Sequence, residues 1–187
     1  MERKSSLYGK RVVAAVLAVL LVLAAVSAYR FAERQWIYPL RYAEFVQKYA
    51  ETFGLEQGWV YAVIKTESGF DASAESGKGA KGLMQITDAT AEFIAGKFGK
   101  KEYDILDAET NILFGCYYLW YLSGKFDFPV TVLAAYNAGE GNVSQWLKDE
   151  RYSADGKTLF AMPYKETENH VKKAQRYREK YRKIYKI

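Results

Sequence analysis

The sequence has little cysteine and little histidine, and these absences exclude a disulfide and the usual metal sites. A single cysteine, Cys116, excludes an intramolecular disulfide, and the apolar run around it predicts a buried thiol rather than a nucleophile. A single histidine, His170, excludes a multi-histidine metal site, and no Cys/His cluster has zinc-ligand spacing. The sequence therefore predicts a protein without a metal site, and no cofactor is expected.

Positive charge is concentrated at the two ends of the chain. The formal net charge is +5, but residues 1–30 carry five basic and one acidic side chain, and residues 172–187 carry eight basic and one acidic. The stretch 31–171 holds fourteen basic and twenty acidic residues, so the body of the protein is acidic. Nucleic-acid binding requires a basic patch across the body, and none is present. We therefore expect no nucleic-acid partner.

An uncharged apolar run covers residues 12–29. As a helix it would span about 27 Å, close to the hydrocarbon thickness of a bilayer. Basic residues precede it, which by the positive-inside rule places the amino terminus in the cytoplasm and the rest of the chain outside. The prediction is a basic cytoplasmic segment (1–11), a transmembrane signal-anchor (12–29), a linker (30–40) and an extracytoplasmic domain (41–187), attached to the cell membrane by one span.

The competing interpretation of the same run is a cleavable signal peptide. Val26-Ser27-Ala28 resembles a small-residue cleavage site, and cleavage after Ala28 would release a secreted domain. The apolar run is longer than a usual signal-peptide core, which favours the uncleaved anchor. Both interpretations export the domain.

Apolar residues beyond residue 40 recur at helical spacing, and no convincing alternating strand pattern is present. Two apolar stripes predict helices that end at Gly54 and Gly69, followed by a loop over 71–81. Capping and breaking residues predict the rest: a helix after Thr87 or Asp88 running to Gly96 or Gly99, one over 108–123 capped by Asp107, one from Pro129 to Gly139, a short one from Asn142 through Leu147, and a last one from near Pro163. The predicted fold is all-α or nearly so.

Glu67 is the candidate acid. It follows Val63 by four residues and Ile64 by three, which places it on the apolar face of its helix. Partial desolvation and the negative end of the helix dipole both favour the protonated carboxyl, the form that a general acid needs. The same periodicity also allows an exposed glutamate at a helix end, or one paired with Lys65.

Four short motifs follow one another in order along the chain: ESGF at 67–70, GLMQI at 82–86, AAYNAGEGNV at 134–143 and PYKETENHV at 163–171. Together they resemble the soluble lytic transglycosylase (SLT) family over roughly residues 41–180, and DAETNI at 107–112 is similar to that family's central helix. The resemblance implies a lysozyme-like α-helical catalytic domain whose partner is the glycan strand of peptidoglycan.

The resemblance also implies a reaction. Glu67 would protonate the glycosidic oxygen between N-acetylmuramic acid and N-acetylglucosamine, and the substrate's own 2-acetamido oxygen would stabilise the anomeric carbon. Glu67, now a carboxylate, would take the proton of the C6 hydroxyl, whose attack closes a 1,6-anhydro ring without water. Substrate assistance explains how one carboxylate suffices where glycosidases usually need two.

Further site residues follow from the resemblance alone. Tyr136 would donate to the reacting oxygen or to Glu67, Ser76 would bind the acetamido group or the acid, and Gly82 would let the backbone approach a sugar. The others are expected to line the cleft or bind the substrate: Met84, Gln85, Asn137 and Glu166. His170 stands where the family commonly has a tyrosine, and we expect it to take over that tyrosine's packing or hydrogen bond.

Several of these residues also have ordinary structural explanations. Met84 fits a buried core position, Gln85 fits a turn, Tyr136 lies on an apolar stripe with Val132, and Glu166 suits the first turn of a helix. Two other functions share the predicted fold: a goose-type lysozyme-like hydrolase in which water attacks, and a non-catalytic, membrane-anchored peptidoglycan-binding protein. The second would need no acid on an apolar helix face.

Overall fold

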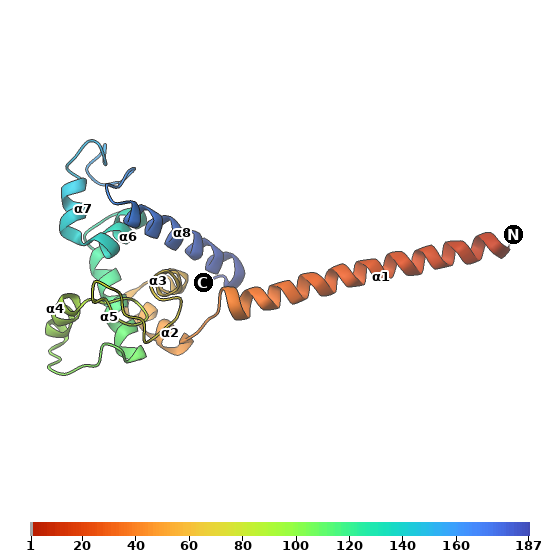
Figure 1. Ribbon diagram of the computed structural model, residues 1–187, viewed down its shortest axis with the longest axis horizontal. Coiled ribbons are helices and arrows are strands. Elements are labelled where there is room, and N and C mark those ends of the chain that lie inside the picture. The colour runs from red at the N-terminus through yellow and green to blue at the C-terminus, as the bar shows by residue number, and fades with distance from the viewer. Residues whose placement is uncertain (1) are drawn as a thin grey trace. The chain divides into compact units, whose positions relative to one another are not determined.

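The computed structural model describes the backbone of residues 2–187 and the side chains of residues 10–187. Met1, Arg3 and Lys4 of the predicted basic segment therefore lie outside the described residues or side chains. The chain divides into two compact units, Met1–Leu40 and Arg41–Ile187. No strand is present in the described part of the chain, which is helical throughout its regular structure, so the all-α prediction is confirmed (Figure 1).

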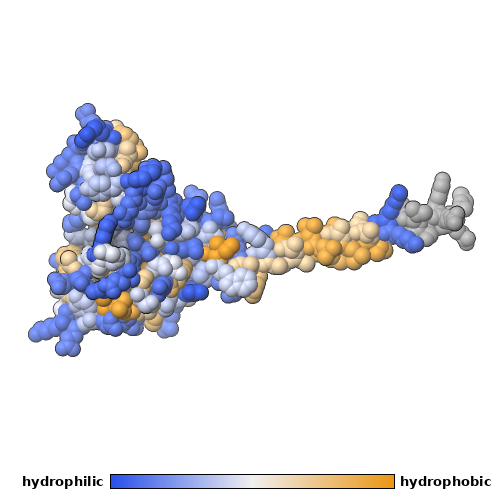
Figure 2. Space-filling view, in the orientation of Figure 1, coloured by the Kyte–Doolittle hydropathy of each residue, from blue (hydrophilic) through white to orange (hydrophobic). Residues whose placement is uncertain are grey.

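The first unit is one long helix, α1 (Glu2–Ala32), continued by a short π-helical segment, η1 (Glu33–Ile37). Most of the range predicted as a linker is thus helical. The stretch Lys10–Ile37 has a mean hydropathy of 2.7 and is long and apolar enough, by length and composition, to cross a membrane. Its apolar side chains are exposed, and Figure 2 shows them as a continuous hydrophobic surface along α1.

The second unit begins with α2 (Ala43–Phe53) and α3 (Gln57–Glu67). Gly54 ends α2 in the left-handed conformation, as predicted. The sequence predicted one apolar face on α3, but the helix is buried on all sides over 58–64. α8 (Lys165–Tyr185), the last helix, packs along it (Figure 1).

The middle of the unit follows the predicted caps closely. Thr87 Oγ1 accepts from the Thr90 amide at the start of α4 (Asp88–Phe98), and Asp107 Oδ2 accepts from the Thr110 amide at the start of α5 (Ala108–Ser123). Pro129 occupies the first turn of α6 (Pro129–Ala138). Each of these residues acts on the backbone within its own first helical turn, so its effect does not depend on tertiary contacts.

Two helix starts differ from the prediction. The short helix α7 (Glu140–Trp146) begins directly after Gly139, whose φ of 87° ends α6 and starts α7. Asn142, the predicted cap, lies inside α7 and donates its Nδ2 to the carbonyl of Ala138, at 2.8 Å. α8 begins at Lys165, two residues later than Pro163.

Cys116 lies in the core between the helices. Its side chain is fully buried on α5, and burial raises the pKa of its thiol. This agrees with the predicted inert thiol rather than with a nucleophile.

Candidate functional site

The carboxyl end of α3 presents Glu67 as the last residue of the helix. The chain then turns sharply, because Gly69 and Phe70 both adopt positive φ, 63° and 73°. Ser68 Oγ holds this turn, accepting from the Phe70 amide at 3.1 Å and donating to the carbonyl of Leu83 at 2.8 Å. A left-handed phenylalanine costs about 1–3 kcal/mol, which the burial of its ring offsets. The ESGF motif is therefore the device that ends α3 at the acid and joins it to the GLMQI segment.

Glu67 is paired with a residue from α8. Its Oε1 lies 2.8 Å from Nε2 of His170, and the two side chains are only 13% and 9% exposed. The sequence suggested Lys65 as an alternative partner, but the Lys65 ammonium lies over the ring of Tyr177, 5.1 Å from its centroid. The acid is thus shielded and held by an imidazole, not by a lysine.

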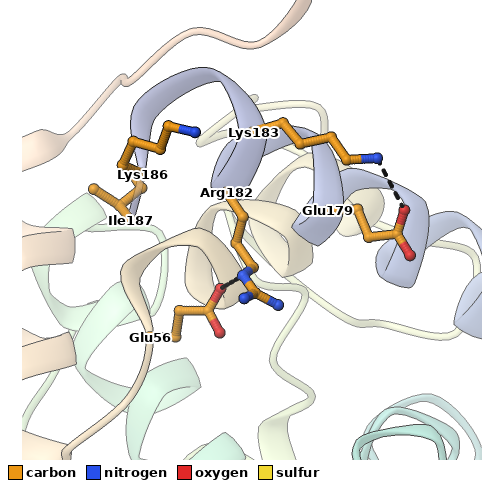
Figure 3. Close-up of a pocket in the computed structure, with 6 residues that line it drawn as sticks. All are labelled: Glu56, Glu179, Arg182, Lys183, Lys186 and Ile187. Carbon is orange, nitrogen blue, oxygen red and sulfur yellow. Dashed lines mark ion pairs between the residues drawn. The ribbon is translucent and has the colours of Figure 1, made fainter.

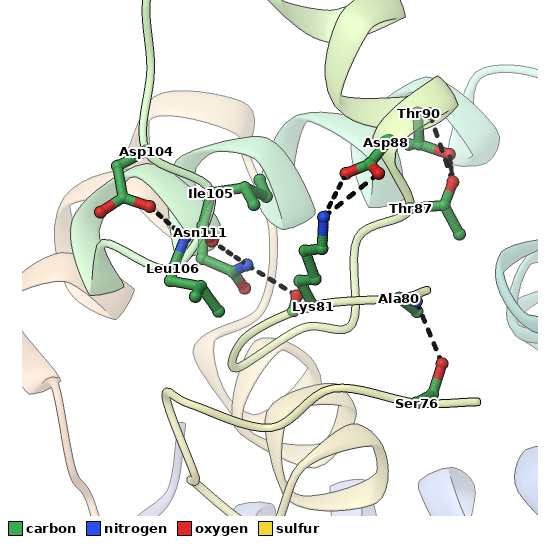
Figure 4. Close-up of polar contacts among 10 residues, drawn as sticks. All are labelled: Ser76, Ala80, Lys81, Thr87, Asp88, Thr90, Asp104, Ile105, Leu106 and Asn111. Carbon is green, nitrogen blue, oxygen red and sulfur yellow. Dashed lines mark hydrogen bonds and ion pairs between the residues drawn. The ribbon is translucent and has the colours of Figure 1, made fainter. Parts of the chain in front are cut away.

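The loop between α3 and α4 carries many of the predicted substrate-binding residues, and contacts of its side chains and backbone hold it together (Figure 4). Ser76 Oγ accepts from the Ala80 amide at 3.0 Å, and isolated bridges join Lys81 to Glu75 and to Ile86. Lys81 also forms an ion pair with Asp88 at 2.9 Å. Ser76 thus stabilises its own turn, and its predicted role toward the acetamido group or the acid stays a prediction.

Asn111, on α5, anchors this loop through its side chain and is fully buried. Its Oδ1 accepts from the Met84 amide at 2.7 Å, and its Nδ2 donates to the carbonyls of Lys81 and Ile105 at 2.9 and 2.8 Å. Gly82 lies against it: a Cβ on Gly82 would lie 2.8 Å from Asn111 Cγ, and the residue has φ 73°. The glycine is required by Asn111 and by the turn, whether or not a sugar also approaches it.

Met84 is fully buried, and its side chain lies against α5. A Cβ on Gly115 would lie 2.7 Å from Met84 Cβ, so the glycine provides the space that the methionine fills. Met84 therefore has the core role that the sequence also allowed, and its side chain offers no exposed surface to an N-acetyl group.

Gln85 has a strained backbone conformation, and its own side chain helps to hold it. Its φ is 48°, and its Nε2 donates to the carbonyls of Ala74 and Gly82 at 3.1 and 2.9 Å. Such a conformation costs about 1–3 kcal/mol and clusters at functional sites. The two side-chain bonds hold the turn of the GLMQI segment, and binding of sugar by Gln85 stays a prediction.

Tyr136 connects α6 to the GLMQI segment. Its hydroxyl donates to the carbonyl of Met84 at 2.9 Å. Burial, followed by the negative charge of Glu67, raises the pKa of Tyr136 well above its ordinary value, so the phenol stays neutral. Its proton is committed to Met84, and donation to a reacting oxygen requires that bond to be exchanged.

Two contacts bring the start of α8 to the same place. Thr167 donates to Asn137 Oδ1 at 2.8 Å, and Glu166 forms an ion pair with Lys78 of the loop at 3.0 Å. Both partners of that ion pair are largely exposed, so it contributes little to stability. The structure thus brings three motifs of the sequence to Glu67, with Glu166 at the outer edge.

A cavity of about 190 Å³ lies next to the ring of Tyr118, a neighbour of Tyr136. The ring of Tyr118, which contacts that of Tyr136 at 5.4 Å between centroids, lines this cavity. Its other lining residues come from α4, α5 and the start of α7: Ala89, Thr90, Phe93, Tyr121 and Glu140. Glu140 is held by Lys125 at 2.7 Å. An aromatic wall with one carboxylate suits the faces and hydroxyls of a sugar.

The sequence and the fold were compared with those of known proteins. The model of the transglycosylase SLT domain matches residues 44–160, more than half of the chain. The chain belongs to the transglycosylase SLT domain family. It is 33% identical over 151 residues to the soluble lytic murein transglycosylase of Escherichia coli K12, covering 78% of this chain and 23% of that protein.

Two further relatives extend the comparison. The membrane-bound lytic murein transglycosylase C of Serratia proteamaculans is 36% identical over 129 residues, covering 62% of this chain and 36% of that protein. The crystal structure of an inactive Glu-to-Gln mutant of the lytic transglycosylase Slt from Pseudomonas aeruginosa matches with a TM-score of 0.68 and 32% identity, over 78% of this chain and 24% of that one. The chain therefore spans between about a quarter and a third of the length of these relatives, and the predicted lysozyme-like SLT fold is confirmed.

The SLT domain has a second, larger cavity of about 790 Å³ at the other end of α3 (Figure 3). Charged side chains line it, and they pair with one another: Arg182 with Glu56 at 3.6 Å, and Lys183 with Glu179 at 3.8 Å. Glu56 precedes α3 whereas Glu67 ends it, so about 16 Å of helix separates the two. This cavity is not part of the Glu67 site.

Sequence reasoning missed three features of the SLT site. The Glu67–His170 bond joins residues 103 apart, and periodicity carries no signal for it. The aromatic cavity was also missed, although Tyr118 and Tyr121 stand three residues apart, a spacing that places them on one helix face. Asn111 lies in the DAETNI segment that resembles the family's central helix, but nothing in the sequence indicated that its side chain anchors the GLMQI segment.

Proposed function

We propose that this SLT domain is a peptidoglycan lytic transglycosylase, with Glu67 as its single acid and base. The observation that carries the proposal is the placement of Glu67: a shielded carboxyl at the end of a buried helix, where the ESGF, GLMQI, AYNAG and α8 segments meet. A relative in the family is inactive as a Glu-to-Gln mutant, which supports an essential glutamate here.

The reaction has two proton transfers on one residue. Protonated Glu67 gives its proton to the glycosidic oxygen as the bond to the anomeric carbon breaks, and the 2-acetamido oxygen of the substrate bonds to that carbon. The Glu67 carboxylate then takes the proton of the C6 hydroxyl. The C6 oxygen bonds to the anomeric carbon and displaces the acetamido oxygen, which returns Glu67 to its acid form and consumes no water.

The other carboxylates near the site have hydrogen-bond or ion-pair partners of their own, and none of those partners is Glu67. Asp71 Oδ1 accepts from the amide and the hydroxyl of Ser73, at 2.9 and 2.7 Å, which lowers the pKa of Asp71. Asp88 is paired with Lys81, and Glu166 with Lys78. A hydrolase with two carboxylates would need one of them freed to act as nucleophile or base.

Substrate contacts are proposed around this acid. Asn137, Gln85 and Ser76 supply polar groups, and Glu166 borders the site from α8. The aromatic cavity beside Tyr118 offers a sugar-sized wall next to the reacting bond. Gly82 has no Cβ, so it would let the backbone of the GLMQI segment approach a sugar closely. Tyr136 supplies a neutral phenol.

Product analysis tests the proposed reaction. The full chain in detergent is expected to release 1,6-anhydromuropeptides from purified sacculi, measured by mass spectrometry. A goose-type hydrolase would instead release reducing muropeptides, heavier by one water molecule. Reducing products would overturn the intramolecular step, and unchanged sacculi together with measurable binding would identify a non-catalytic peptidoglycan-binding protein.

We also propose that α1 anchors the domain in the cell membrane, with residues 41–187 outside the cytoplasm. The exposed apolar surface of Lys10–Ile37 and the membrane-bound relative support this. The protein isolated from cells is expected to stay with membranes after an alkaline wash, and to retain residues before Ala28 by mass spectrometry. A soluble protein that begins after Ala28 would show cleavage instead.

A further inference from the structure

The bond between Glu67 and His170 is made by the only histidine in the chain. His170 lies in the second turn of α8, and its Nε2 lies 2.8 Å from Glu67 Oε1. Its other ring nitrogen, Nδ1, is buried and has no hydrogen-bond partner among the described residues. The ring therefore meets the acid through one nitrogen, while the other faces packed protein.

This environment selects a tautomer. A proton on Nδ1 would be a buried N–H without an acceptor, and orphaned N–H groups are rarer in proteins than unpaired acceptors. With the proton on Nε2 instead, the ring is neutral, Nδ1 keeps only a lone pair, and Nε2 donates to Glu67. The hydrogen-bond network thus indicates a neutral donor rather than an imidazolium or a proton relay.

Two residues on the same face of α8 as His170 hold this part of the helix in place. Thr167, His170 and Lys173 are spaced by three, and each reaches a different part of the site. Thr167 donates to Asn137 of α6, and Lys173 donates to the carbonyl of Thr66, at 3.2 Å, beside the acid. The face that carries His170 is therefore pinned both to α6 and to the end of α3.

We propose, on the basis of the proposed function, that His170 is a positioning residue that determines which oxygen of Glu67 transfers the proton. Nε2–H occupies Oε1, and no hydrogen bond to Oε2 is present among the described residues. Oε2 then carries the acidic proton, loses it to the glycosidic oxygen and regains it from the C6 hydroxyl. His170 keeps its own proton throughout, so the same bond serves both halves of the reaction.

Two substitutions separate this role from packing and from proton transfer. In the full chain, His170→Gln keeps an amide donor near the position of Nε2, whereas His170→Phe keeps a ring without a donor. On soluble glycan-strand fragments, His170→Phe is expected to lower kcat by about 10- to 100-fold with little change in KM, because the hydrogen bond to the Glu67 carboxylate that forms during proton transfer is lost. His170→Gln is expected to stay within about tenfold of the wild type.

The matched packing control is Val171→Ala, which truncates the buried side chain next to His170 on α8 and removes no hydrogen-bonding group. It is expected to lower thermal stability while leaving kcat near the wild-type value. Equal activity of His170→Phe and wild type would overturn the proposal. So would a His170→Gln variant as inactive as His170→Phe although both fold, because that result would show that a hydrogen-bond donor near the position of Nε2 is not what the ring supplies.

Nuclear magnetic resonance of the full chain in detergent gives a readout besides activity. With only histidine labelled with nitrogen-15, the single ring is expected to show Nε2 protonated and Nδ1 bare at neutral pH, and Glu67→Ala is expected to perturb the Nε2 signal. A protonated Nδ1 would contradict the proposal. If wild type released no anhydro product, the proposed function would fail, while the ring signals would still report the bond.

Discussion

Glu67→Gln is expected to abolish the release of 1,6-anhydromuropeptides while leaving the fold intact. Glutamine has nearly the same shape, and its Oε1 can still accept from His170, but its amide neither gives nor takes a proton at neutral pH. Each proton transfer by a positioned acid or base contributes about 10²- to 10⁴-fold, and Glu67 performs both, so a loss of at least about 10³-fold is expected. Muropeptide release from sacculi measures it.

The matched control for this change is Glu44→Gln, the same substitution at an exposed position in the first turn of α2. It is expected to retain wild-type activity. Glu67→Gln should also keep its thermal unfolding midpoint within a few degrees, which separates lost chemistry from lost structure. Residual activity near the wild-type level in a folded Glu67→Gln variant would assign the acid to another residue.

The sequence predicted most of the fold because its helix boundaries are local. Asp107, Thr87 and Pro129 act within a few residues of their own positions, and each starts the predicted helix. Asn142 shows the limit of that logic. Its chemistry suits a cap, but Gly139 already starts the helix there, and the Asn142 side chain bonds backward to Ala138 instead.

The site was predictable only in part, because its contacts join distant segments. The sequence proposes Glu67 as the acid from its helix face and its motif, but it gives no signal for the bond between Glu67 and His170. Met84 shows what a motif leaves open: its motif suggested a substrate contact, while the space provided by Gly115 buries its side chain. A motif identifies which segments meet, whereas burial, which depends on the packed structure, determines which side chains of those segments remain exposed to a ligand.

Asn111 is the residue whose loss is expected to cost most stability. Asn111→Ala leaves the Met84 amide and the Ile105 carbonyl buried without this partner, and it opens a cavity in the core. The carbonyl of Lys81 keeps its bond from the Ile86 amide, at 3.0 Å. A buried group left unsatisfied costs about 1–3 kcal/mol, so the variant is expected to lose about 2–5 kcal/mol of unfolding free energy.

Activity should fall with stability in this variant, because the same amide supports the site. Asn111 accepts from the Met84 amide, and the Met84 carbonyl accepts from the Tyr136 hydroxyl, so the loosened segment is hydrogen-bonded to a proposed site residue. Thermal unfolding of the full chain in detergent is expected to show a midpoint lower by roughly 5–15 °C. Anhydro-product release measured well below that midpoint reports the effect on the site.

Asn142→Ala is the matched control, since it removes the same side chain from an exposed position with a single bond to the Ala138 carbonyl. Exposed substitutions of this kind usually change stability by less than about 0.5 kcal/mol. Equal unfolding midpoints for the two variants would show that the loop is held by its own turns, at Ser76 and Gln85, rather than by α5. A large difference, with activity lost only in Asn111→Ala, would identify this amide as the link between the core and the loop that joins α3 to α4.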